Sequence, residues 1–266
     1  PAWHVRSHWR DYTLVQTLQG TSLEERVAYL EELRKAAPES INSDFERNLD
    51  MLWIYHDSAL EGVVYTQDEL KSAILDQVMS DSSLIPVYDE IRHHRAAIQT
   101  IRQLAQKKKL TVDLDLIKGL FAQLAPEEIE GKAPPKYRKD MPLHRLYFHD
   151  IATPDKIAAQ MKTLVQWVND PDTKRSTHIV RLAAKTHYSL LQTYPFPKHS
   201  GKVARLILNV MLMDVGYPPV IIHATERQRY YEALKQGEDR TAALVSEALV
   251  ASVESTISFY ERLQEG

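Results

Sequence analysis

A short segment, residues 194–205, gathers cationic side chains beside the expected start of a helix: Lys198, Lys202 and Arg205. Lys202, Arg205 and Asn209 are spaced so that they share one helix face. A helix start also offers free backbone N–H groups and the positive end of the helix dipole. The segment therefore predicts an anion site, with phosphate as the ligand that fits best. The alternative is that these side chains are ordinary solvated cations on a helix surface.

Two prolines and a serine place this loop between two helices. The helix before it carries apolar residues as far as Leu190 and ends before Pro195, because the residue preceding a proline is pushed out of the α region. Ser200 is predicted to cap the next helix, since a serine oxygen accepts hydrogen bonds from the first turn. Gly216 and the prolines after it end that helix.

The rest of the chain also predicts helices. Apolar residues recur with a period of 3.6 and period-two alternation is scarce, while the 266 residues include only 8 glycines. Thr66 and Glu69 form a capping-box pattern at the start of one helix. Further helices are expected at 45–56, 87–104, 114–124, 154–168 and 174–190, and from about 225 and 240. We therefore expect an all-α fold.

A proline-rich connector divides the chain. Residues 127–142 carry a glycine and several prolines among charged residues, a pattern typical of an irregular segment. This connector separates an N-terminal helical region, residues 1–130, from a core, residues 131–266. Residues 143–149 are the best candidate for a strand pair or an extended flap.

The composition excludes several classes of protein. The net charge of −3 offers no field to attract nucleic acid or an anionic membrane. Cysteine is absent from the sequence, so disulfides and thiolate metal sites are excluded, which suits a reducing cytosol. The sequence contains no run of about 18 apolar residues that would predict a membrane span. We expect a cytoplasmic protein without nucleic-acid or membrane partners.

The order of these features resembles the Fic family of nucleotide-transferring proteins over nearly the whole chain. The family motif, His-Pro-Phe-x-Asp/Glu-Gly-Asn-Gly-Arg-x-x-Arg, lies in a loop between two helices, and Pro195, Phe196, Gly201 and Arg205 match it. The resemblance implies a helical Fic-like core with a small β-hairpin flap at 143–151 that docks a target protein. The flanking segments match the family more closely than the motif does: His187-Tyr188, Gly216-Tyr217-Pro218-Pro219 and Tyr230-Tyr231-Glu232-Ala233-Leu234.

A second motif precedes the core. Residues 57–62 resemble the family's inhibitory motif, Ser/Thr-x-x-x-Glu-Gly/Asn, with Asp57 at its first position. The resemblance implies that Glu61 pairs with Arg205. That pairing would block productive seating of a nucleotide γ-phosphate.

The loop departs from the family at the residues that carry its chemistry. Family members move AMP from ATP onto a protein hydroxyl, with the motif histidine as base and the acidic residue on Mg²⁺. Tyr194 replaces that histidine, and a tyrosine is a poor base at neutral pH. Lys198 replaces the acidic residue, and an ammonium group cannot bind Mg²⁺. His199 has a side chain of the right type for a base, but it lies five residues past the position of the family histidine.

The anion cradle is altered as well. Ser200 replaces the motif asparagine, and Lys202 replaces the first arginine and loses its bidentate geometry. The expected ligand is ATP or another nucleotide, bound without Mg²⁺ and without a protein metal site. The residues expected to bind the nucleotide or anion are Lys198, Ser200, Gly201, Lys202, Arg205, Asn209 and Tyr231.

Three hypotheses follow. The first is a Fic-fold protein with a degenerate motif that has lost Mg-dependent AMP transfer, binds a phosphate-containing anion at 194–205 and docks a partner at the flap. The second is an active, AMPylation-type transferase with metal-independent chemistry or a donor other than ATP, in which Tyr194 or His199 participates. The third is a helical scaffold whose loop binds nothing. Whether the protein is an enzyme, and whether it forms a homodimer as many relatives do, stays open.

Overall fold

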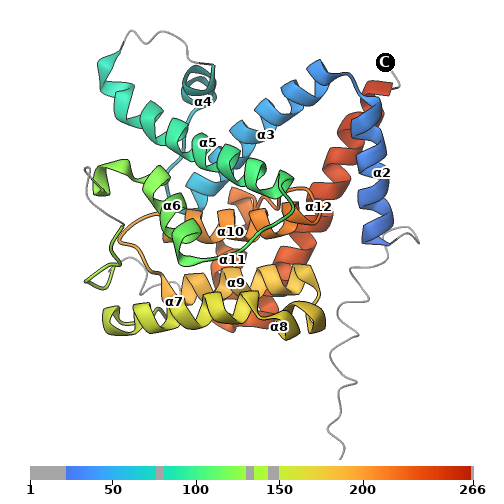
Figure 1. Cartoon of the computed structure of the whole chain (residues 1–266). Helices are drawn as coiled ribbons and strands as arrows, with labels where there is room; N and C mark the ends of the chain where they lie inside the picture. The colour runs from blue at the N-terminus through green and yellow to red at the C-terminus, as the bar shows by residue number, and fades with distance from the viewer. Residues whose placement is uncertain (1–21, 76–80, 130–134, 143–149, 265–266) are drawn as a thin grey trace, which may run out of the picture.

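Figure 1 presents the computed structural model, which describes residues 22–75, 81–129, 135–142 and 150–264. Within these ranges the regular elements are helices and no strand occurs. The helices of the first half are α2 (Leu23–Ala36), α3 (Glu39–Leu60), α4 (Gln67–Ile74), α5 (Ile85–Gln106) and α6 (Leu114–Leu124). Those of the second half are α7 (Pro154–Asn169), α8 (Pro171–Ser176), α9 (Ile179–Thr193), α10 (Ser200–Asp214), α11 (Arg227–Gln236) and α12 (Glu238–Gln264). Short 3-10 helices lie at Ser82–Leu84 (η1), Pro126–Glu128 (η2) and Ala224–Glu226 (η4).

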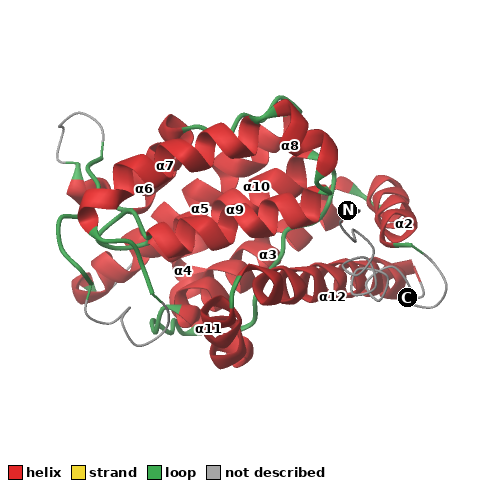
Figure 2. Cartoon of the chain, turned by 90° about the horizontal axis from the view of Figure 1, so that it is seen from below, coloured by secondary structure: helices red, strands yellow, loops and turns green. Residues whose placement is uncertain are grey.

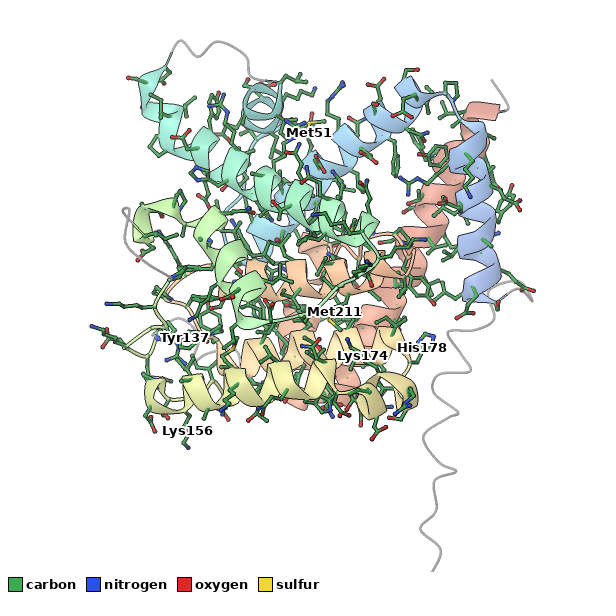
Figure 3. All side chains as sticks on the ribbon, viewed as in Figure 1. Met51, Tyr137, Lys156, Lys174, His178 and Met211 are labelled. Atoms are coloured by element: carbon green, nitrogen blue, oxygen red, sulfur yellow. The ribbon has the colours of Figure 1, made fainter. Side chains whose placement is uncertain are left out.

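α10 is the central helix of the fold. Every side chain from Ser200 to Leu212 is buried, as expected of a helix that is covered on all sides. It packs against α9, α5 and α6, and Figure 1 shows it between α5 and α9. In the perpendicular view α7 and α12 lie along opposite edges of the molecule (Figure 2). Figure 3 shows Met211 of α10 in the interior, whereas Lys156 of α7 points outward.

α3 brings the inhibitory-like motif to this centre. Its second half is buried through Trp53, Ile54 and Leu60, and it packs on α5 and η4. Gly62 follows its end with φ +93, a left-handed conformation that glycine adopts without a Cβ penalty. Glu61 is therefore held at the C-terminal end of α3, where its side chain can reach the neighbouring helix.

Most predicted helices are confirmed, including the capping box at Thr66 and Glu69. The single helix expected from about 174 is wrong, because two helices, α8 and α9, occupy that stretch. Thr177 between them is extended, His178 is not helical, and the His178 ring accepts a hydrogen bond from the Val180 N–H at 3.3 Å. A side-chain cap of this kind competes with helix continuation.

Two predictions fall outside the described residues. The flap predicted at 143–149 lies there, and so does the boundary predicted between residues 130 and 131. No strand occurs in the described flanks at 150–152. α5 and α6, from the region before that boundary, pack directly on α10, so the described helices on both sides share one core.

α12 is long and apolar enough to cross a membrane by length and composition. Its most apolar window, within Glu238–Leu263, has a mean hydropathy of 1.3. Half of that window is buried in the protein, where α12 packs on α2, α9 and α11. A helix buried in the core of a large domain passes the same test, and we describe α12 as a core helix.

Candidate functional site

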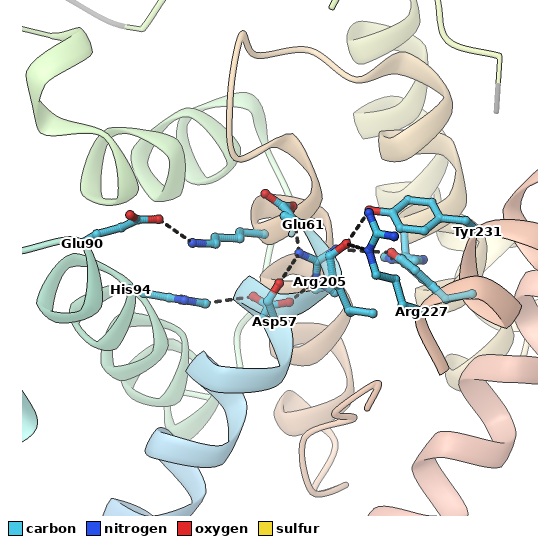
Figure 4. Close-up of polar contacts among 11 residues, drawn as sticks. Asp57, Glu61, Glu90, His94, Arg205, Arg227 and Tyr231 are labelled. Atoms are coloured by element: carbon cyan, nitrogen blue, oxygen red, sulfur yellow. Dashed lines mark hydrogen bonds and ion pairs between the residues drawn. The ribbon is translucent and has the colours of Figure 1, made fainter. Parts of the chain in front are cut away.

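Arg205 lies where the end of α3 meets the start of α10. Its side chain is 4% exposed. Its Nε donates to Asp57 Oδ1, and its Nη2 donates to Glu61 Oε1 at 2.9 Å (Figure 4). Its Nη1 donates to the Tyr230 hydroxyl at 3.4 Å. The predicted pairing of Glu61 with Arg205 is thus present, and Asp57 adds a second carboxylate to the same guanidinium.

Asp57 is anchored on its other side by His94. His94 Nε2 lies 3.0 Å from Asp57 Oδ2, and both side chains are buried. Burial by itself would raise the pKa of Asp57, but Arg205 and His94 outweigh it and lower this pKa to about 2. Burial lowers the pKa of His94 despite the nearby carboxylate. At neutral pH Asp57 is therefore charged and His94 is neutral.

Glu61 occupies the N-terminal end of α10. A methyl group added at Gly201 would collide with Glu61 Oε1 and lie 3.0 Å from Arg205 Nη1. The carboxylate therefore lies directly on the first turn of the helix, where backbone N–H groups lack helical partners and the dipole is positive. In this arrangement the predicted anion site is filled by an anion of the protein itself.

Lys202 is paired with a residue that the sequence analysis missed. Its Nζ lies 3.1 Å from Glu90 Oε1 of α5, and its side chain is buried. Burial would raise the pKa of Glu90, but Lys202 outweighs it and lowers that pKa. Glu90 and His94 stand one turn apart on α5 and contact Lys202 and Asp57 respectively. Their i, i+4 spacing is the sequence pattern from which their position on one face of α5 could have been predicted.

Lys198 turns toward η2 instead of this cluster. Its Nζ contacts Glu127 and lies 3.4 Å from Glu128 Oε1. The three cations predicted to gather at one anion site are thus divided. Among the described residues of the site, the carboxylates of Asp57, Glu61 and Glu90 face the two cations Lys202 and Arg205.

Three further predicted ligand residues make structural contacts. Ser200 is the first residue of α10 and not its cap; its hydroxyl accepts from Phe196 N–H at 2.8 Å and donates to Phe196 O at 3.1 Å. The Asn209 amide bonds both backbone groups of Val220, at 3.0 and 2.7 Å. The Tyr231 hydroxyl donates to Leu60 O at 3.1 Å. In these positions the polar atoms of the three side chains hold the loop, the α10 C-terminal connection and the end of α3.

Tyr194 and His199 bound the loop in left-handed conformations, with φ of 46° and 56°. Tyr194 ends α9 and is buried. His199 precedes α10 as its cap residue without a side-chain capping bond. Burial lowers the pKa of His199 to about 4, and Lys202 contributes in the same direction. His199 is therefore neutral at neutral pH and can accept a proton, although only weakly.

Arg138 holds the loop from the connector and was not predicted. It is buried, and its guanidinium donates to backbone carbonyls, including Tyr194 O at 2.6 Å and Thr193 O at 3.3 Å. Its own N–H donates to Pro195 O at 2.9 Å. No sequence pattern marks a residue that binds carbonyl groups across such a separation.

The described residues contain no group of three or more His, Asp or Glu side chains placed to hold a metal. A cavity of about 1240 Å³ lies among α2, α3, α12 and the segment 215–223, and none of residues 194–205 lines it.

Comparison with known proteins relates this geometry to a family. Residues 90–212 match the model of the Fic/DOC family. The relatives named "Protein adenylyltransferase Fic" from Drosophila virilis and Drosophila willistoni are both 30% identical over 94% of this chain. The chain spans about half of their length, 51% and 50% respectively.

Solved structures share the fold. A Fic domain containing signaling protein from Bacteroides thetaiotaomicron superposes with a TM-score of 0.74 and 22% identity, over 89% of this chain and 98% of that protein. Fic-1 from C. elegans gives a TM-score of 0.71 and 22% identity, over 90% of this chain and 73% of that one. At this identity the likeness concerns the fold alone.

The Asn209→Ala substitution tests whether that amide is structural. It leaves two buried backbone groups of Val220 without partners, and we expect the free energy of unfolding to fall by about 2 kcal/mol. Urea denaturation measures this loss. Asn48→Ala, at an exposed position of α3, is the matched control and should change stability little. Equal stability of the two variants would show that the Val220 contacts contribute nothing.

The Asp57 carboxylate should make stability depend on acid pH. Because its folded-state pKa, about 2, lies below the usual value of about 3.9, its ion pair stabilises the fold above pH ~4 and is lost as pH falls toward 2. We expect the stability difference between wild type and Asp57→Asn to be constant from pH ~5 to 7 and to shrink below pH ~4. Urea denaturation in a His94→Gln background separates this effect from titration of His94. A difference that does not depend on pH would contradict the assignment.

Proposed function

The chain carries a Fic/DOC family domain, and we propose that its motif loop is a phosphate-binding site that Glu61 keeps closed. The observation that carries the proposal is the Glu61 carboxylate, which lies on the first turn of α10 and pairs with Arg205. A carboxylate and a phosphate oxygen have the same requirements, namely N–H donors and positive charge. An incoming phosphate group would therefore take the place of Glu61.

The ligand class is a nucleotide or another phosphate-containing anion. The relatives named protein adenylyltransferase make the adenine nucleotides the first candidates. Lys202 lies on the same first turn as Gly201, and its charge is available to an anion in exchange for its pairing with Glu90. We expect the flap at 143–151 to be the docking place of a target protein.

Mg-dependent AMP transfer is poorly supported by this loop. Tyr194 stands at the position of the family base, and Lys198 stands at the position of the metal-binding acid. Lys198 is also committed to Glu127 and Glu128. A phenol holds its proton at neutral pH, and an ammonium group repels a divalent cation. We infer that the motif is degenerate. In this inference the loop still binds a phosphate-containing ligand but no longer carries out Mg-dependent AMP transfer.

Removing the Glu61 side chain tests the proposal. We expect Glu61→Ala to bind AMP at least about tenfold more tightly than wild type, because the competing carboxylate is gone. Isothermal titration calorimetry with AMP, ADP and ATP, with and without Mg²⁺, measures the affinities. Glu32→Ala removes the same charge from an exposed position of α2 and should leave them unchanged. Absence of any binding by Glu61→Ala would overturn the proposal, and loss of binding in Glu61→Ala/Arg205→Ala would support it.

A second candidate function, altered transfer chemistry, rests on His199. This residue flanks the first turn of α10 and carries a neutral imidazole at neutral pH, because burial lowers its pKa to about 4. It could accept the proton of a target hydroxyl while the hydroxyl oxygen bonds to the α-phosphorus and pyrophosphate leaves. Pyrophosphate release by Glu61→Ala, together with its loss in Glu61→Ala/His199→Ala, would favour this function. Release that persists without His199 would remove this role.

A further inference from the structure

Two carboxylates from one helix hold Arg205, and they hold it differently. Asp57 and Glu61 stand one turn apart on the same face of α3. Asp57 is 3% exposed and takes the Nε edge of the guanidinium, with His94 on its second oxygen. Glu61 sits at the end of the helix, is 11% exposed and takes one Nη2 hydrogen. Figure 4 shows Asp57 placed between His94 and Arg205. Glu61 is therefore the displaceable partner and Asp57 the fixed one.

This difference determines the charge of the opened site, by which we mean the first turn of α10 after Glu61 has moved away. Once Glu61 has moved away, Asp57 and Glu90 remain opposite Arg205 and Lys202. Two negative charges then balance two positive charges, and the excess attraction comes mainly from the N-terminus of α10, equivalent to about half a charge. Lys198 adds little, since it is paired with Glu127 and Glu128. Arg227 lies at the same end of α3, where its Nε donates to Leu60 O at 2.9 Å. Each phosphate beyond the first would therefore have to draw Arg227 or Lys198 away from its present partner.

The hydrogen-bond geometry of Arg205 also favours a ligand with a single phosphate group. With Nε donating to Asp57 and Nη1 directed to the Tyr230 hydroxyl, Arg205 can offer a ligand the Nη2 edge that Glu61 leaves. Its side-on pair of donors, Nε and Nη2, is already engaged by Asp57 Oδ1 and Asp57 O, which removes one of the two bidentate faces that an arginine can offer a phosphate. One phosphate group on α10 would satisfy the donors that become available.

We propose that Asp57 is a positioning residue that sets ligand charge, so that the opened site prefers a single phosphate group, as in AMP or inorganic phosphate, over a polyphosphate. This inference rests on the proposed function, because it describes the ligand of the same site. The sequence pattern agrees with it: Asp57 stands where the inhibitory motif of the resembling family has an uncharged serine or threonine. Asp57 does not touch the ligand and acts through Arg205.

The experiment compares nucleotide selectivity in two proteins, Glu61→Ala and Glu61→Ala/Asp57→Asn. Asparagine keeps the shape and the acceptor for Arg205 Nε but removes the charge. Calorimetry measures Kd for AMP, ADP and ATP without Mg²⁺. We expect Glu61→Ala to bind ATP no more tightly than AMP. We expect the added Asp57→Asn change to strengthen ATP binding about tenfold more than AMP binding, with a steeper dependence on salt.

Asp50→Asn in the same Glu61→Ala background is the matched control. Asp50 is equally buried on α3 and pairs with Arg102 at 2.6 Å and Arg95 at 3.5 Å. It lies two turns before Asp57, about 10 Å along the helix axis. Its removal should leave the ATP to AMP affinity ratio of Glu61→Ala unchanged.

The outcomes separate this inference from the proposed function. No binding of any nucleotide by Glu61→Ala would overturn the proposed function. Binding with an affinity ratio that Asp57→Asn leaves unchanged would overturn the role of Asp57 alone. A preference of Glu61→Ala for ATP over AMP of tenfold or more would overturn it without any Asp57 variant. If circular dichroism shows that Asp57→Asn is unfolded, Asp57→Ser serves in its place, with the same expected change in ratio.

Discussion

The burial of the Arg205 guanidinium is the constraint on which the site depends. Removing such a charge from water costs several kcal/mol unless close partners compensate it. Its carboxylate partners, Asp57 and Glu61, come from α3, far away in sequence. The end of α3 must therefore lie against the start of α10, and Gly62 and the buried second half of α3 make that approach possible.

The loop before α10 also depends on partners for buried polar groups, here the groups of its own backbone. Its two left-handed residues, Tyr194 and His199, stop one helix and start the next within a few residues. Arg138 and Ser200 bond the backbone groups that such a turn leaves without helical partners. The exception is the first turn of α10, where the Glu61 carboxylate lies. Such a loop, with an internal carboxylate at the first turn of α10, fits the proposed displacement of Glu61 by a phosphate group.

The sequence predicted much of this arrangement and missed specific parts of it. Helical periodicity and caps predicted most of the helices, because these signals are local. The pairing of Glu61 with Arg205 came from the resemblance. The contacts of Lys198 and Asn209 were not predictable, because their partners are brought near only by the tertiary fold. Lys198 contacts Glu127, and Asn209 contacts Val220. The importance of Asp57 was hidden because its partner His94 lies on another helix, α5.

The central claim is that Glu61 and an external phosphate compete for the first turn of α10. The backbone amide of Gly201 reports on that turn directly, and its ¹⁵N–¹H resonance can be followed while inorganic phosphate is added to wild type and to Glu61→Ala. The account predicts that this resonance moves at phosphate concentrations at least about tenfold lower in the variant than in wild type. Identical titration curves, or a Gly201 resonance in the variant that phosphate does not move, would contradict it.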